Sequence, residues 1–163
     1  MDPNLDLHYG FDSIGADRDV LILDLDGTLC DINHRAHLAQ AKQWDEFHAG
    51  LEQDGVHHDV LLVLRFLPAF VRVIVVTGRP MAHYGATVAW LRKHDLWALV
   101  DSIMMRPDIN FMKDHELKLW LLDEFFEGRE NWTSRTIAAL DDKDSVIEAF
   151  RNAGINAWQV RPG

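Results

Sequence analysis

The sequence predicts an α/β fold, a Rossmann-like, doubly wound parallel sheet with helices on both of its faces. Two observations carry this prediction: short, continuous apolar runs that stop at polar residues, and helical apolar patterns between those runs. Continuous apolarity is typical of parallel strands that are covered on both faces. We expect a single domain over residues 1–163, because that length suits one compact core.

Five apolar runs have the length and the end signals of buried strands. The first begins at Asp19 and stops at the carboxylates and glycine of Asp24 to Gly27. The full set of predicted strands is 19–27, 71–76, 99–105, 136–140 and 155–160. Helical patterns lie between or beside them, over 35–51, 58–67, 82–94, 114–126 and 145–153.

Two regions depart from this alternation. Residues 1–17 show little periodicity, and we expect a loosely ordered lead-in there. Residues 29–57 are longer than a simple crossover needs. The sequence therefore predicts a small helical cap or lid inserted over the site.

Composition and charge exclude several classes of protein. The chain has 16 Lys and Arg against 26 Asp and Glu, a formal net charge of −10, which does not attract long stretches of nucleic-acid backbone. No apolar run approaches the length of a membrane span, and the acidic N-terminus is unlike a signal peptide. The single cysteine, Cys30, cannot form an internal disulfide. We therefore expect a soluble, cytoplasmic protein that does not associate with membranes.

Polar residues gather where the predicted strands end. In open α/β sheets, ligands bind beyond the carboxyl ends of the strands. The residues placed there are Asp24 and Asp26 after the first strand, Thr77 after the second, Asp141 and Asp142 after the fourth, and Lys113 and Lys118 on the helix after the third. Massed carboxylates persist when a hard cation neutralises them, and oxygen ligands suit Mg²⁺. Each short motif is weak evidence alone, but their ordered occurrence at successive strand ends predicts a site.

The chain resembles the haloacid dehalogenase-like (HAD) phosphohydrolase superfamily. Asp24-Leu25-Asp26-Gly27-Thr28 matches its first motif, Thr77 its second, Lys118 its third, and Asp141-Asp142 its fourth. A closer resemblance, to the phosphatase domain of bacteriophage polynucleotide kinase–phosphatase, is carried by Arg106 to Lys118, by Ala139 to Lys143 and by Gly154 to Val160. Met112 and Lys143 depart from that pattern.

The resemblance implies a role for each motif residue. Asp24 would attack phosphorus and form an aspartyl-phosphate, and Asp26 would act first as general acid and then as general base. The metal would be held by Asp24, the backbone carbonyl of Asp26, and Asp142 or Asp141. Thr77, Gly78 and Lys118 would hold phosphoryl oxygens.

Further candidates are weaker. His34 and Arg35 follow the first motif closely and could contact the leaving group, and Arg79 could reach substrate. The alternative for His34 and Arg35 is a solvated helix start, and the alternative for Arg79 is a surface charge. Lys113 is the alternative to Lys118.

The leading functional hypothesis is a Mg²⁺-dependent phosphatase that removes 3′-phosphates from polynucleotide ends or nucleotides. The alternatives are a 5′(3′)-mononucleotide phosphatase and, from a different class, a non-catalytic HAD-fold binding module. None of the ten glycines precedes a lysine, so a phosphate-cradling P-loop is absent from this sequence. A kinase or ligase that works with this chain would therefore be separate, and no obligate protein partner is evident.

Overall fold

A computed structural model describes residues 8–9 and 19–161. Its main sheet has six strands in the order β1-β6-β5-β2-β7-β8. The strands are β1 (His8–Tyr9), β2 (Val20–Leu23), β5 (Arg72–Pro80), β6 (Ser102–Arg106), β7 (Thr136–Asp141) and β8 (Ala157–Gln159). All neighbours pair in parallel except β1, which runs antiparallel to β6 at the edge. The predicted doubly wound parallel sheet is confirmed.

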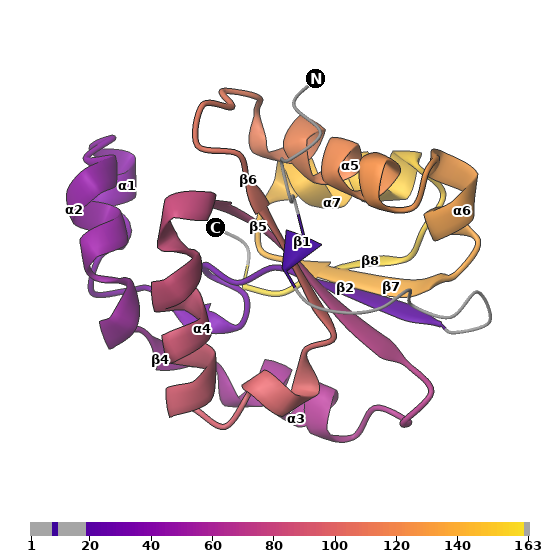
Figure 1. Ribbon diagram of the computed structural model, residues 1–163, viewed down its shortest axis with the longest axis horizontal. Coiled ribbons are helices and arrows are strands. Elements are labelled where there is room, and N and C mark those ends of the chain that lie inside the picture. The colour runs from indigo at the N-terminus through magenta and orange to yellow at the C-terminus, as the bar shows by residue number, and fades with distance from the viewer. Residues whose placement is uncertain (1–7, 10–18, 162–163) are drawn as a thin grey trace.

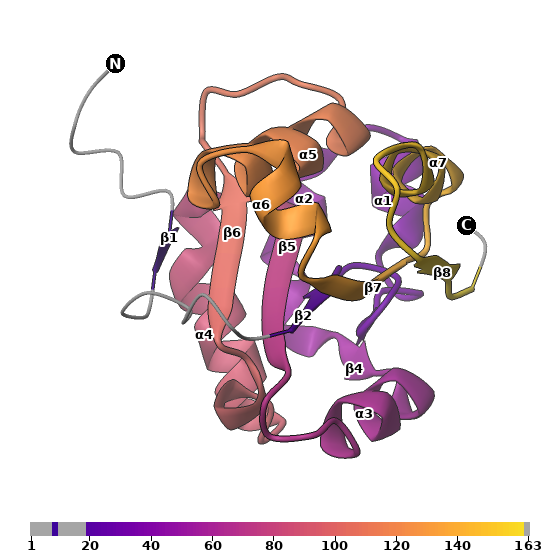
Figure 2. The same cartoon turned by 90° about the vertical axis from the view of Figure 1, so that its right-hand side faces the viewer.

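Helices cover both faces of this sheet (Figure 1). The helices α3 (His58–Arg65) and α4 (Tyr84–Lys93) lie on one face, and α5 (Asp114–Phe125), α6 (Arg129–Thr133) and α7 (Asp144–Asn152) lie on the other (Figure 2). Successive residues of β2 alternate between the two cores. Leu21 and Leu23 face the α3–α4 side, whereas Val20 and Ile22 face the α5–α7 side. This alternation explains why β2 has no polar residue to interrupt its apolar run.

The segment between β2 and α3 forms its own small structure. Two short helices, α1 (Ala36–Gln40) and α2 (Trp44–Ala49), are followed by a 3-10 turn, η1 (Leu51–Gln53). A two-stranded antiparallel ribbon of β3 (Cys30–Asp31) and β4 (Gly55–Val56) closes the segment at its base. In Figure 1, α1 and α2 stand beside the helical layers rather than within them. The role of the inserted segment, residues 29–57, as a lid stays a prediction.

The predicted elements differ from the structure in a few places. The helical pattern over 35–51 is broken into α1 and α2 at Lys42, whose φ is 56°. The ribbon β3–β4 and the helix α6 were not predicted, since each is too short to show a clear period. Most of the expected lead-in, 1–17, lies outside the described residues, although His8–Tyr9 forms β1. Within the described part, no helix is both long and apolar enough to cross a membrane.

Candidate active site

The carboxyl ends of β2 and β7 bring two carboxylates to one buried lysine. Lys118, from the second turn of α5, places its Nζ 2.6 Å from Asp24 Oδ1 and 2.6 Å from Asp141 Oδ2. The backbone N–H of Asp24 donates to Leu140 O at 3.0 Å, which fixes the first carboxylate beside the end of β7. All three charged side chains are almost fully buried. A buried ion pair of this kind needs close geometry to offset its desolvation cost.

Asp142 completes an acidic cluster with Asp24 and Asp141. Ligand oxygens of these three carboxylates lie within 4.8 Å of one another. Asp24 Oδ2 and Asp142 Oδ1 are buried and accept no hydrogen bond from any residue that the structure describes. Gly27, with φ of 88°, passes so close that an added Cβ would lie 2.5 Å from Asp142 Oδ2. Unsatisfied buried carboxylate oxygens around a tight cradle are what a hard divalent cation would satisfy.

The electrostatics of the cluster fit the same interpretation. Burial, opposed by Lys118 and reinforced by Asp141 and Asp142, raises the pKa of Asp24 to about 8. Burial and the neighbouring Asp141 raise the pKa of Asp142 to about 6. Although burial favours the neutral amine, Asp141 and Asp24 hold the pKa of Lys118 well above its ordinary value. One ammonium therefore does not balance three carboxylates, and a further positive charge would complete the site.

Asp26 is in a different environment from Asp24. Arg35 Nη2 donates to Asp26 Oδ1 at 2.6 Å, while Arg79 donates from Nη2 at 2.5 Å and from Nε to Oδ2 at 3.0 Å. Burial alone would raise the pKa of Asp26, but Arg79 and Arg35 outweigh it and hold that pKa well below the usual range. In the free protein Asp26 is therefore an ionised carboxylate.

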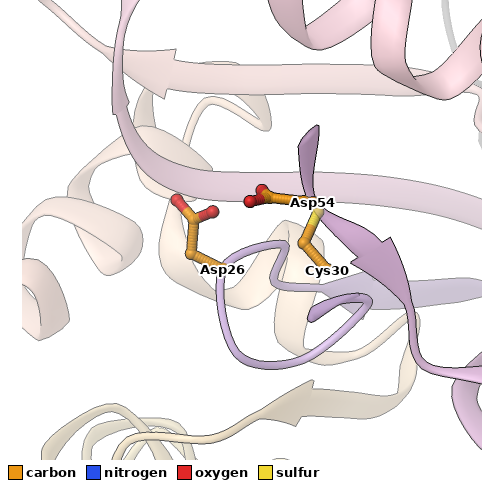
Figure 3. A group of neighbouring side chains, drawn as sticks. All are labelled: Asp26, Cys30 and Asp54. Atoms are coloured by element: carbon orange, nitrogen blue, oxygen red, sulfur yellow. The ribbon is translucent and has the colours of Figure 1, made fainter. Parts of the chain in front are cut away.

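The inserted segment supplies a further buried acid, Asp54, which the sequence analysis missed. Figure 3 shows its carboxylate facing that of Asp26, with the sulfur of Cys30 beside it. Asp54 accepts from Arg35 at 2.5 and 2.6 Å and from Arg79 at 3.2 Å. The guanidinium groups of Arg35 and Arg79 thus already balance the carboxylates of Asp26 and Asp54. These two carboxylates therefore have no need of a metal ion. Burial also raises the pKa of the Cys30 thiol well above its ordinary value, so Cys30 is not an activated nucleophile.

The three candidate substrate contacts, His34, Arg35 and Arg79, fall into this second group. Arg35 and Arg79 are 1% and 0% exposed, and their guanidinium groups also donate to Phe47 O, Thr87 Oγ1 and Cys30 Sγ. Arg35 also packs over the Phe47 ring at 4.0 Å, so it ties α2 to Asp26. His34 is more open and its Nε2 lies 3.0 Å from Asp54 Oδ1. Contact of these three residues with substrate stays a prediction, whereas their contacts with Asp26 and Asp54 are findings.

Thr77 and Gly78 lie in the C-terminal half of β5, at the same edge of the sheet. Thr77 is buried, and its Oγ1 accepts from the backbone N–H of Arg79 at 3.3 Å. An added Cβ at Gly78 would lie 2.5 Å from an oxygen of Asp114, the first residue of α5. Asp114, also absent from the predicted set, binds Lys143 Nζ at 2.6 Å and lies 3.9 Å from Lys118 Nζ. Its position four residues before Lys118 on a helix was the signal that could have found it.

Of the two candidate lysines, Lys118 is the one that reaches the cluster. Lys113 is exposed and precedes the first turn of α5. The structure therefore brings together Asp24, Asp141, Asp142 and Lys118 as one group, and Asp26 with Arg35 and Arg79 as another.

Comparison with known families and proteins gives a consistent result. Residues 18–163 match the family model described as the polynucleotide kinase PNKP phosphatase domain. A protein described as a bifunctional polynucleotide kinase/RNA ligase, from Autographa californica nuclear polyhedrosis virus, is 27% identical over 130 residues. That match covers 78% of this chain and 18% of the viral protein.

Solved structures show similarity over nearly the whole chain. A chain of the Pnkp1/Rnl/Hen1 RNA repair complex superposes with a TM-score of 0.74 and 25% identity, over 96% of this chain and 46% of that one. The HAD hydrolase YfnB of Bacillus subtilis, in a magnesium-bound form, shares the fold with a TM-score of 0.61 at 14% identity, over 89% of each chain. This chain thus spans less than half of the repair-complex chain and a much smaller part of the viral protein.

Proposed function

Because the chain belongs to the polynucleotide kinase PNKP phosphatase domain family and is a HAD-type phosphatase, we propose that it is a Mg²⁺-dependent 3′-phosphatase. It would act on polynucleotide ends or nucleotides through an aspartyl-phosphate. The observation that carries this proposal is the contact of Lys118 with both Asp24 and Asp141, beside two carboxylate oxygens that lack partners among the described residues.

Asp24 is the nucleophile of the proposed reaction. Its Oδ1 is held by Lys118, and its Oδ2 has no protein donor in the described part of the chain, so one carboxylate oxygen would attack phosphorus while the other would contact the ion. A carboxylate attacks only when ionised; burial raises the pKa of Asp24 to about 8 against the opposing effect of Lys118, so a bound cation would complete its ionisation near neutral pH. Thr77 and the backbone at Gly78 lie at the same edge of the sheet, where they would bind phosphoryl oxygens. Such preplaced donors stabilise the charge that develops on the transferred group.

Asp26 is the general acid and then the general base of the proposed reaction. Arg35 and Arg79 keep it ionised in the free protein, which is the form that would take the proton of the water that hydrolyses the aspartyl-phosphate, but the same two arginines make it a weaker base. Acting as general acid in the first step requires that it carry a proton, and a bound phosphoryl group would favour this by adding negative charge nearby. The two arginines fix the orientation of the Asp26 carboxylate.

Asp24, Asp142 and Asp141 would hold the Mg²⁺, with the backbone carbonyl of Asp26 as a further oxygen ligand. The unpartnered oxygens of Asp24 and Asp142 and the close approach of Gly27 fit a hard cation. When bound, the ion would supply charge that offsets repulsion between the phosphoryl oxygens and the carboxylates.

The net charge of −10 favours a small or end-bound substrate over a long polyanion. A 5′(3′)-mononucleotide phosphatase is therefore the second candidate function. We also propose that the domain works in the cytoplasm, beside a separate kinase or ligase. The relatives described as a kinase/ligase and as part of a complex with Rnl and Hen1 support that partnership.

A side-by-side assay tests the proposed function. It compares release of phosphate from a 3′-phosphorylated oligonucleotide, 3′-dTMP, 5′-dTMP and a sugar phosphate, with Mg²⁺ and with excess chelator. The proposal expects Mg²⁺-dependent turnover with the two 3′-phosphates preferred. Preference for 5′-dTMP would favour the second candidate, and full activity in chelator would exclude the proposed metal role.

A further inference from the structure

The loop between β6 and α5 presents apolar side chains to solvent beside the candidate site. Ile109 is 87% exposed and Phe111 is 92% exposed. The loop projects beyond the helical layers at the top of Figures 1 and 2. Exposing a whole aromatic ring forgoes roughly 1.5–3 kcal/mol of burial, and exposed apolar groups next to a functional site are often contact surfaces.

The backbone of this loop is held in place by hydrogen bonds. Arg106 Nη1 donates to the carbonyls of Met112 at 2.7 Å and Asn110 at 3.3 Å, and the Asn110 side chain accepts from the Met112 N–H at 2.9 Å. Asp108 accepts from the backbone N–H of Ala82, in the 3-10 turn η2 (Met81–His83), at 2.8 Å. The Met112 side chain packs against the core. The fixed backbone therefore holds the Phe111 ring outward.

Arg106 also connects the loop to the site. Its Nε donates to Gly78 O at 3.1 Å, directly after Thr77. Its Nη2 lies 3.5 Å from Asp114, the residue that binds Lys143. The loop thus borders the end of β5 where the phosphoryl group is proposed to bind, and Phe111 lies on that loop.

Electrostatics favour stacking over phosphate contacts at this loop. The cationic side chains around the site already pair with carboxylates. They are Arg35, Arg79, Arg106, Lys118 and Lys143. Lys113, next to the loop, is an exposed cation, but the net charge of the whole chain is −10. The phosphate backbone of a nucleic-acid substrate therefore gains little binding free energy from this surface. An aromatic ring, in contrast, can stack on any base.

We propose that Phe111, with Ile109 beside it, is the platform on which the nucleobase next to the hydrolysed phosphate stacks. This inference rests on the proposed 3′-phosphatase function and names the part of the substrate that the loop recognises. Phe111 is then a specificity-determining residue, because it contacts the non-reacting portion of the substrate and distinguishes nucleotides from other phosphomonoesters.

The test compares two oligonucleotides with the same 3′-phosphate, one with a normal terminal nucleotide and one with an abasic terminal nucleotide. The wild-type protein should show a kcat/KM about tenfold higher for the base-bearing end, as loss of one stacked base would predict. Phe111→Ala should reduce this ratio to near one, mainly through KM, and Phe111→Trp should retain it. Phe66→Ala, which removes a ring that is 83% exposed at the end of α3, is the matched control and should keep the ratio.

The possible results separate the two proposals. If the wild-type protein hydrolyses neither oligonucleotide, the proposed function fails and this inference fails with it. If it hydrolyses both at equal rates, or if Phe111→Ala keeps the wild-type ratio, the 3′-phosphatase proposal stands and the stacking platform is excluded.

Discussion

Lys118 lies between Asp24 and Asp141, with its Nζ 2.6 Å from an oxygen of each. The lysine comes from α5 and the two acids from β2 and β7, so one cation joins three elements that are distant in sequence. The same contact leaves Asp24 Oδ2 without a partner among the described residues. Lys118 thus holds the folded site together and fixes the orientation of Asp24, the proposed nucleophile.

Replacing Lys118 with methionine should cost activity and stability together. We expect kcat to fall by at least ~10², because a cation that meets the phosphoryl charge is lost. Without Mg²⁺, the free energy of unfolding should fall by about 3–5 kcal/mol at pH 8, because buried carboxylates lose their partner. The loss should be smaller at pH 6, since the carboxyl groups can then take up protons. Chemical denaturation at both pH values measures this, and an equal loss at both would contradict the assigned ion pair.

Arg79→Met tests the arginines that hold Asp26. The substitution removes two hydrogen bonds to Asp26 and leaves Arg35 to balance two buried carboxylates. We expect a loss of about 3–5 kcal/mol in stability and roughly 10² or more in kcat. Arg79→Lys should restore little, because an ammonium cannot form the forked contact.

Arg129→Met is the matched control for Arg79. It breaks a partly exposed pair with Asp123, so it should change stability by about 1 kcal/mol or less and leave kcat unchanged. An equal effect of the two substitutions would show that the Asp26 network has no special role.

Gly27→Ala should impair metal binding specifically. Its positive φ costs about 1 kcal/mol for any residue with a Cβ, and the new atom would collide with Asp142. Gly154→Ala, at a φ of 91° with nothing within 4 Å of its Cβ, incurs the backbone cost alone. Both variants should lose similar backbone stability, but only Gly27→Ala should weaken Mg²⁺ affinity, which titration calorimetry would detect. Equal affinities in the two variants would remove Asp142 from the proposed ligand set.

Stability and Mg²⁺ binding should depend on pH in opposite directions. The pKa of Asp142 is raised to about 6 and that of Asp24 to about 8, so each holds its proton more tightly when folded than when unfolded. Their contribution to the stability of the metal-free protein is complete below pH ~4 and is lost as the pH rises through 6 and 8.

Mg²⁺ competes with those protons. The increase in Tm on adding Mg²⁺ should therefore be larger at pH 8 than at pH 6. Asp142→Asn should flatten this dependence. An increase in Tm that is the same at both pH values would show that the ion does not bind at these carboxylates.

Much of the fold and the first acidic cluster could be predicted from the sequence. The five parallel strands have continuous apolar runs, and parallel pairing places their carboxyl ends, and hence Asp24 and Asp141, at one edge. Asp54 could not be found in this way, because it joins Arg35 and Arg79 only after folding, across 19 and 25 residues of chain. Phe111 was equally hidden, since an apolar residue is expected to be buried, and the hydrogen bonds that fix its loop form only in the folded protein.

The central claim, that Asp24 carries the phosphoryl group, is tested most directly by trapping the intermediate. The protein is mixed with a 3′-phosphorylated oligonucleotide and Mg²⁺, quenched in acid during the first turnover, and reduced with borohydride, which converts an acyl phosphate to the corresponding alcohol. Peptide mass spectrometry should then find homoserine at position 24 in the wild-type protein and no such product, and no turnover, in Asp24→Asn. Reduction at another carboxylate, or turnover that persists in Asp24→Asn, would contradict the account.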